Sequence, residues 1–140
     1  EIDTGGLLTV DHYIPLDAGG DDTDDNLVYA CFRCNLYKGD YFPDATALLA
    51  GHCILHPQRD NLTAHLREDP ETQYLVSLSA TAQFHVVRLR LNRQELVARR
   101  RRLALAVLDA ARLRLLEQYA EELENVVEEQ KRLIERLRGL

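Results

Sequence analysis

Five polar residues near the start of the chain have the types and spacing of a site that could activate a water molecule. Asp11 and His12 are adjacent, and Asn26, Asn35 and Lys38 follow within 27 residues. Carboxylate and amide oxygens are the ligands that hard divalent cations prefer. A neutral histidine next to a metal-bound carboxylate can accept the proton of an attacking water. These residue types therefore suit metal-assisted hydrolysis, although an Asp-His pair alone would indicate little.

The order and separation of these residues carry more information than the pair. The string is an Asp-His-x-x-Pro run, a Gly-Gly pair, an Asn-Leu pair and a Cys-x-x-Cys-Asn-x-x-Lys-Gly run, at residues 11–15, 19–20, 26–27 and 31–39. As a whole it resembles the HNH endonuclease family, whose fold is the ββα-metal motif. The resemblance is close over residues 7–39. Shorter phrases at 55–57, 66 and 89–96 resemble the C-terminal part of some bacterial members, and the helix beyond Arg102 has no counterpart.

The resemblance implies a role for each polar residue of the string. It implies His12 as the general base, and Asp11 and Asn35 as oxygen ligands of one divalent cation, Mg²⁺ or Mn²⁺. It places Asn26 where an asparagine ties the loop back and orients the base. Lys38 would contact the scissile phosphate or a neighbouring one, or else complement the helix dipole. The implied function is an endonuclease, an enzyme that hydrolyses nucleic-acid phosphodiesters, with DNA favoured over RNA.

Two other interpretations of the same residues stay open. A relative with an idle site would bind nucleic acid through its basic residues without cleaving it. Alternatively, the chain would be a gated subunit of a larger assembly that the C-terminal helix organises. The bacterial settings of the family make antiviral defence or mobile elements a plausible context.

Cys31 and Cys34 form a Cys-x-x-Cys pair, which suits half of a four-thiolate structural zinc site. Many HNH relatives carry the other pair just upstream of the first strand, but no cysteine precedes the string here. Either that pair lies before Glu1, which we favour, or the two thiols are packing residues. Three further residues could join such a site but are expected to pack or to lie on the surface: His52, Cys53 and His56.

The formal net charge of −6 hides an uneven distribution of charge. Residues 1–50 hold ten acidic and two basic side chains, whereas residues 85–102 hold seven arginines and one glutamate. A basic strip suits phosphates, so we expect four consecutive arginines to bind nucleic acid: Arg99, Arg100, Arg101 and Arg102. The alternative for them is a solvated turn of helix. The four aspartates within residues 21–25 are expected to form a solvated loop, because clustered carboxylates would repel DNA.

Local patterns predict an α+β fold that begins with a strand, a long loop, a strand and a helix. We expect strands over 7–10, 27–30 and 74–78 and a first helix over 31–38. Ser79 would cap a further helix, and Asn92 with Glu95 would form a capping box for the last one. Adjacent side chains such as Asp11 and His12 point to opposite faces of a regular strand, so we expect the strand to end or bulge there.

The last helix meets no proline or glycine before Gly139, so it would be about 65–70 Å long. Its apolar positions from residue 116 onward alternate spacings of three and four, which is a heptad seam with Gln130 as its one polar member. Acidic residues dominate 117–129 and basic residues 131–138, an order that favours an antiparallel pair. We therefore expect a homo-oligomer, or a partner protein, docked through residues 116–140.

Length and composition limit the number of domains and the class of protein that the chain can form. The 140 residues are 46% hydrophobic and 29% charged, which suits one small globular domain with an extension. We expect a nuclease core over 1–57, an accessory strand and helix segment over 58–92, and the long, partly coiled-coil-like helix over 93–140. No apolar run is long enough for a membrane span, and three cysteines without a secretory signal suggest reduced thiols in the cytoplasm.

Overall fold

The computed structural model describes residues 7–139, and its first elements are a hairpin and a short helix. Strand β1 (Leu8–His12) pairs antiparallel with β2 (Leu27–Cys31), and helix α1 (Phe32–Lys38) follows β2 directly. The Cys31 sulfur caps α1 by accepting the N–H of Cys34 at 3.3 Å. The expected order of strand, loop, strand and helix is confirmed.

Strand β1 stays regular to its last residue. The register runs from Leu8 opposite Cys31 to His12 opposite Leu27, and Asp11 lies opposite Val28. The strand therefore ends at His12, as expected, and needs no bulge. Asp11 and His12 leave opposite faces of the hairpin, so the chain after His12 determines whether they can border one site.

The rest of the first compact unit consists of short helices and strands. They are η2 (Leu16–Ala18), α2 (Ala45–Leu49), α3 (Leu62–His65), β3 (Leu66–Glu68), β4 (Leu75–Ser77) and α4 (Ala80–Arg88). Strands β3 and β4 form a second antiparallel pair. The Ser79 hydroxyl accepts the N–H of Ala82 at 3.1 Å, which confirms the expected cap of α4. The overall class is α+β, as predicted.

A small apolar core ties these elements together. Its buried side chains come from β2, the segment before residue 57, α4 and the start of α5: Val28, Cys31, Ile54, Leu55, Ala82, Val86, Leu89, Leu96 and Val97. Arg88 of α4 donates to the carbonyl of Lys38 at 3.0 Å and lies over the ring of Tyr41. Helix α4 therefore holds the C-terminal end of α1, where the candidate site begins.

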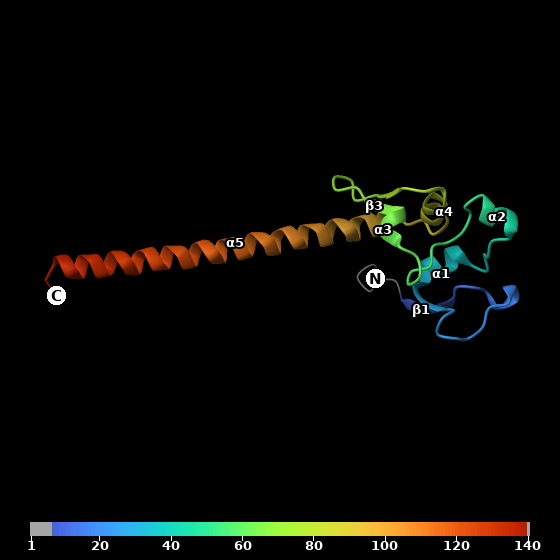
Figure 1. Cartoon of the computed structure of the whole chain (residues 1–140), viewed down its shortest axis with the longest axis horizontal. Helices are drawn as coiled ribbons and strands as arrows, with labels where there is room; N and C mark the ends of the chain where they lie inside the picture. Colours follow the sequence, from blue (N-terminus) through green and yellow to red (C-terminus); the bar gives the residue numbers. More distant parts are fainter. Residues whose placement is uncertain (1–6, 140) are drawn as a thin grey trace. The chain divides into compact units, whose positions relative to one another are not determined.

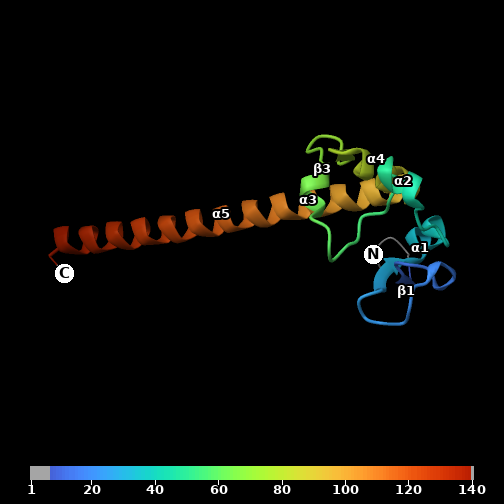
Figure 2. The same cartoon turned by 45° about the vertical axis from the view of Figure 1, so that its right-hand side comes forward.

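Helix α5 (Gln94–Leu137) contributes its first two turns to this unit. Both views place α3 and β3 beside those turns (Figure 1, Figure 2). The side chain of Asn92 does not cap the helix, which corrects the expected capping box. Its amide accepts the N–H of Leu75 at 2.7 Å and donates to the carbonyl of Leu75 at 2.9 Å, so it extends β4 instead.

The second compact unit is the part of α5 from Arg102 onward. Every residue from 105 to 139 is exposed in it, including the large apolar side chains of the expected seam. Among the described residues, no helix has the length and apolarity needed to span a membrane.

The buried His85 predicts a pH dependence of stability. Its Nδ1 accepts the N–H of Leu55 at 3.1 Å, and burial lowers the pKa of the imidazole from 6.5 to about 4. Between these values the unfolded chain binds more protons, so the free energy of unfolding falls as pH drops from about 6.5 to 4, by on the order of 2–3 kcal/mol. Urea titrations of the wild type and His85→Gln across this range test it. Parallel pH profiles for the two proteins would contradict the prediction.

Candidate active site

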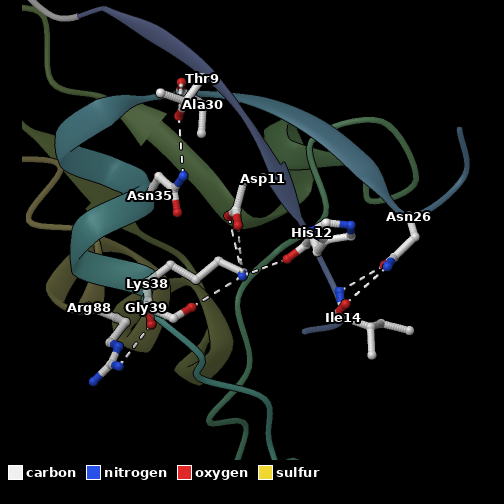
Figure 3. Close-up of polar contacts among 10 residues, drawn as sticks. All are labelled: Thr9, Asp11, His12, Ile14, Asn26, Ala30, Asn35, Lys38, Gly39 and Arg88. Atoms are coloured by element: carbon white, nitrogen blue, oxygen red, sulfur yellow. Dashed lines mark hydrogen bonds and ion pairs between the residues drawn. The ribbon is translucent and has the colours of Figure 1, made fainter. Parts of the chain in front are cut away.

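A buried ion pair joins β1 to the end of α1. The Lys38 ammonium lies 3.3 Å from Oδ1 and 3.2 Å from Oδ2 of Asp11. It also donates to the carbonyls of His12, at 2.6 Å, and Gly39, at 3.3 Å (Figure 3). The two paired side chains are only 7% and 11% exposed. The ammonium of Lys38 is therefore held beside Asp11 by four oxygens, two from the carboxylate and two from backbone carbonyls.

Asn35 lies one turn before Lys38 on the same helix. Its amide nitrogen donates to the Thr9 hydroxyl at 3.2 Å, and that hydroxyl donates to the carbonyl of Ala30 at 3.3 Å. The amide is therefore oriented by β1 and β2, and its oxygen lies on the side of the group away from Thr9 (Figure 3). An oriented amide oxygen next to a carboxylate is a suitable pair of donors for a hard cation.

His12 faces the long loop between the strands. Its Nε2 lies 2.8 Å from Oδ1 of Asp22, and the two side chains are 31% and 87% exposed. One ring nitrogen of the imidazole thus contacts a carboxylate, and the ring as a whole remains partly exposed to solvent. A neutral histidine in this setting can accept a proton at its other nitrogen.

Asn26 is buried and closes the loop. Its amide oxygen accepts the N–H of Ile14 at 2.8 Å, and its amide nitrogen donates to the carbonyls of Ile14, at 2.9 Å, and Asp21, at 2.8 Å. The reciprocal pair with Ile14 is visible in Figure 3. Asn26 therefore joins the residues that follow His12 to the loop.

Four of the five predicted site residues border one open pocket of about 310 Å³, and Asn26 is not among its lining residues. Asp11 and His12 line it from β1, and Asn35 and Lys38 line it from α1. The acidic side chains of Asp17 and Asp40 also line it, with Pro15, Leu16 and Gly39. Asp11 and His12 thus meet in one pocket, although they leave opposite faces of the strand.

The donor set suits a cation that keeps much of its water shell. Among residues 7–139, no cluster of three His, Cys, Asp or Glu side chains could enclose a metal ion. Mg²⁺ usually binds through one or two carboxylates and completes its shell with waters and substrate phosphate. One carboxylate and one oriented amide oxygen in an open pocket fit that pattern.

The two thiols of the Cys-x-x-Cys pair face a cation. Arg93 donates to the sulfur of Cys31 at 3.4 Å and to that of Cys34 at 3.6 Å. Burial and a hydrogen bond with Cys31 raise the pKa of Cys34 to about 11, so this thiol is protonated near neutral pH. Among residues 7–139 the two thiols thus contact Arg93 and link α1 to the start of α5. A structural zinc site that includes further ligands stays a prediction.

The basic residues expected to bind phosphate differ in their surroundings. Lys38 points inward to Asp11, so only a phosphate inside the pocket could reach it. The Arg100 guanidinium donates to the carbonyls of Gln73, at 2.6 Å, and Leu91, at 3.1 Å. It thereby joins α5 to the rest of its unit. Arg99 is half-buried, Arg101 is exposed but donates to the carbonyl of Thr72 at 3.3 Å, and Arg102 is exposed.

Residues 2–41 match the family model described as HNH endonuclease. These residues are thus similar to that family, and they are called the HNH segment below. The match confirms the resemblance expected from the residues, and it indicates a nuclease-type function that involves nucleic acid. No curated protein and no solved structure matches the chain. The residues predicted as metal ligands, base and loop tie, together with Lys38, lie inside the HNH segment, whereas the four arginines lie outside it.

One contact of the HNH segment is not expected from the sequence. Composition predicts that Asp22 lies with its acidic neighbours in a solvated loop, yet its carboxylate contacts His12. The sequence offers one signal for this contact: the Gly-Gly dipeptide followed by Asn26, which indicates a tightly closed loop. This signal predicts that the loop returns to the strand, but it does not predict which aspartate contacts the histidine.

Proposed function

We propose that the HNH segment is a metal-dependent endonuclease that hydrolyses phosphodiester bonds of DNA. The observation that carries the proposal is the pocket in which a carboxylate, an oriented amide and a solvent-open imidazole come together. Asp11 and Asn35 would hold one Mg²⁺ or Mn²⁺ ion. Such an ion polarises the phosphate and offsets the charge that develops on its oxygens.

The chain's own residues account for the remaining requirements. His12 takes the proton of the attacking water, since its imidazole borders the pocket and remains partly open to solvent. Lys38 neutralises Asp11 and, in this proposal, contacts a phosphate that enters the pocket. Asn26 keeps the segment after His12 in place through Ile14. The three free cysteines agree with a reducing compartment such as the cytoplasm.

Incubation with end-labelled duplex DNA, single-stranded DNA and RNA, with Mg²⁺ present, tests the substrate class. We expect cleavage of DNA in preference to RNA. Complete indifference to all three polymers, with intact folding, would contradict the proposal.

A second candidate is an HNH module that binds nucleic acid with its site idle or gated. The ammonium of Lys38 favours it, because it occupies the space beside both oxygens of Asp11. Gel-shift and cleavage assays on one DNA separate the two functions. A shifted band without product at saturating Mg²⁺ supports the second candidate, and product formation supports the first.

Three arginines at the start of α5 are proposed to bind the phosphates of the substrate: Arg99, Arg101 and Arg102. Replacing all three with alanine should weaken DNA affinity and reduce the slope of log affinity against log salt by about one for each phosphate that is no longer bound. Fluorescence anisotropy at several salt concentrations measures both quantities. Arg100→Ala is the matched control, because its guanidinium bonds within the fold; it should lower stability and keep the salt slope. An unchanged slope in the triple variant would mean that this strip is solvated.

The exposed seam of α5 is proposed to pair with a second copy of the chain. Six of its large apolar side chains in the described part are 47–87% exposed: Leu116, Tyr119, Leu123, Val126, Leu133 and Leu137. Leu140 lies outside the described residues. Burial of each such side chain contributes about 1.5–3 kcal/mol before the cost of association. A helix gains little from propensity alone, so this face needs a second surface.

The charges beside the seam favour an antiparallel pair. If Leu123 packs opposite Leu133 of the second copy, the heptad geometry brings Glu122 next to Arg136 of that copy, twice by symmetry. On the other flank Val127 then lies beside its own copy and Ile134 beside Ala120 of the second copy, so this flank is apolar. In a parallel pair the same glutamates would face apolar residues. The antiparallel arrangement also places Glu129 of one chain near Glu129 of the other. This one repulsive pair stands against the two attractive Glu122–Arg136 pairs.

Leu123→Glu combined with Leu133→Glu should convert the assembly to monomers, because it places charges in the centre of the seam. Light scattering at tens of micromolar measures the mass, and Mg²⁺ binding should persist. Gln118→Glu with Asn125→Glu adds the same charge off the seam and should leave the dimer intact. A monomeric wild type at that concentration would rule out self-association and leave docking on a partner protein.

A further inference from the structure

The acidic loop of the HNH segment is not uniform. Asp21 accepts the N–H and the hydroxyl of Thr23, at 3.2 Å and 2.6 Å, and so shapes the turn. The backbone carbonyl of Asp25 accepts a hydrogen bond from Arg59. Asp22 instead reaches His12, with 2.8 Å between its Oδ1 and Nε2 of the ring. One carboxylate of this cluster therefore belongs to the site, although its side chain is largely exposed.

The backbone on both sides of this contact is held by the same amide. Asn26 donates to the carbonyl of Asp21, directly before Asp22, and bonds in both directions with Ile14, two residues after His12. A single buried side chain thus sets the separation between the loop and the end of β1. The position of Asp22 follows from this lock and does not depend on packing of its own side chain.

Gly20 allows the loop to come this close. A Cβ at this position would lie 1.9 Å from the carbonyl oxygen of Ile14 and 2.7 Å from the amide nitrogen of Asn26. Both separations are shorter than any side chain tolerates, and the nearer one is to backbone. The closed loop is therefore a built feature, and the approach of Asp22 to His12 is one of its consequences.

We propose that Asp22 is a positioning residue for His12. Its carboxylate accepts the Nε2–H of the imidazole, which holds the neutral ring in that tautomer and leaves Nδ1 as the proton acceptor. The inference rests on the proposed nuclease function. In that reaction the water gives its proton to Nδ1 and its electron pair to phosphorus, and the leaving oxygen departs with its bond pair and is protonated by solvent. Asp22 exchanges no proton and fixes the direction of the ring.

The size of the effect follows from the exposure of the pair. Removal of a group that orients a ligand or base typically costs 10–100-fold in activity. Asp22 is 87% exposed, so water can replace part of its interaction, and we expect the lower half of this range. The decrease should appear in kcat and leave KM within about threefold, because the groups that bind substrate are unchanged.

The kinetic experiment compares Asp22→Ala, Asp22→Glu and Asp24→Ala in single-turnover and steady-state DNA cleavage. Asp24 is exposed in the same loop, so its replacement removes the same charge and serves as the matched control. We expect kcat to fall about 10–30-fold in Asp22→Ala, to recover in part in Asp22→Glu and to stay unchanged in Asp24→Ala. Equal kcat values for the two alanine variants would overturn the proposal.

A spectroscopic readout keeps this test independent of catalysis. Long-range ¹H–¹⁵N correlation spectra at about pH 8 report which ring nitrogen of a neutral histidine carries the proton, with His12→Ala to assign the signal. We expect the Nε2–H tautomer in the wild type and in Asp24→Ala, and a tautomer mixture in Asp22→Ala. A wild-type ring protonated at Nδ1 would overturn the proposal. If the wild type cleaves no DNA, the proposed function fails, and the tautomer still decides the role of Asp22.

Discussion

His12→Ala is expected to lower the rate of DNA cleavage by about 10²–10⁴-fold, because it removes the positioned base that deprotonates the attacking water. The imidazole borders the pocket, and its ring contact in the described part of the chain is with Asp22 on the exposed loop. The hairpin should therefore form as before. Single-turnover cleavage with saturating Mg²⁺ measures the decrease.

The matched control for this variant is His52→Ala. His52 stacks on Phe84 away from the pocket residues, and its removal should leave the rate within a few-fold of the wild type. Metal binding should survive in His12→Ala, since the base is not proposed as a ligand. Undiminished turnover in His12→Ala would remove His12 from the catalytic role.

Asp11→Asn and Asn35→Ala are expected to weaken Mg²⁺ binding and activity together, by about 10-fold or more, because each removes one of the two proposed protein donors. Asp11→Asn keeps the shape of a side chain that is only 11% exposed. Asp11→Asn and truncation to alanine both remove the countercharge of the Lys38 ammonium, but asparagine keeps one acceptor oxygen, whereas truncation removes every side-chain acceptor, at a cost on the order of 3–5 kcal/mol. Calorimetric titration with Mg²⁺ or Mn²⁺ measures the affinity directly.

Asp17→Asn is the control for the metal titration. Asp17 lines the same pocket, so its replacement removes the same charge without touching the proposed donors. We expect its effect on affinity to be small. Wild-type affinity in both donor variants, with weaker binding in Asp17→Asn, would move the ion to the other side of the pocket.

The local elements of the site could be predicted because their signals are short in sequence. Cys31 caps α1, Gly39 ends it with a positive φ of 54°, and Ser79 caps α4, all within one turn of the residues they affect. The absence of proline and glycine before Gly139 predicted the extent of α5. Such signals depend on backbone geometry that neighbouring residues determine.

Interactions between distant segments could not be predicted in this way. Asn92 has the right neighbours for a capping box, yet it pairs with Leu75, because β4 offers it both a donor and an acceptor. Arg100 belongs to a run of four arginines, but two backbone carbonyls hold its guanidinium. Asp22 differs from its acidic neighbours only through the path of the loop. In each case a specific partner outweighs the average behaviour of the residue type.

Nicking of supercoiled plasmid by the wild-type chain tests the central proposal of metal-dependent phosphodiester hydrolysis most directly. The measurement follows conversion to open-circular and linear DNA with added Mg²⁺, with a chelator, and after Mg²⁺ is returned in excess. We predict cleavage with Mg²⁺, none with the chelator and full recovery on return of the ion, with His12→Ala about 10²–10⁴-fold slower wherever the wild type is active. Cleavage that persists in the chelator, or that His12→Ala carries out at the wild-type rate, would contradict the assignment of the pocket.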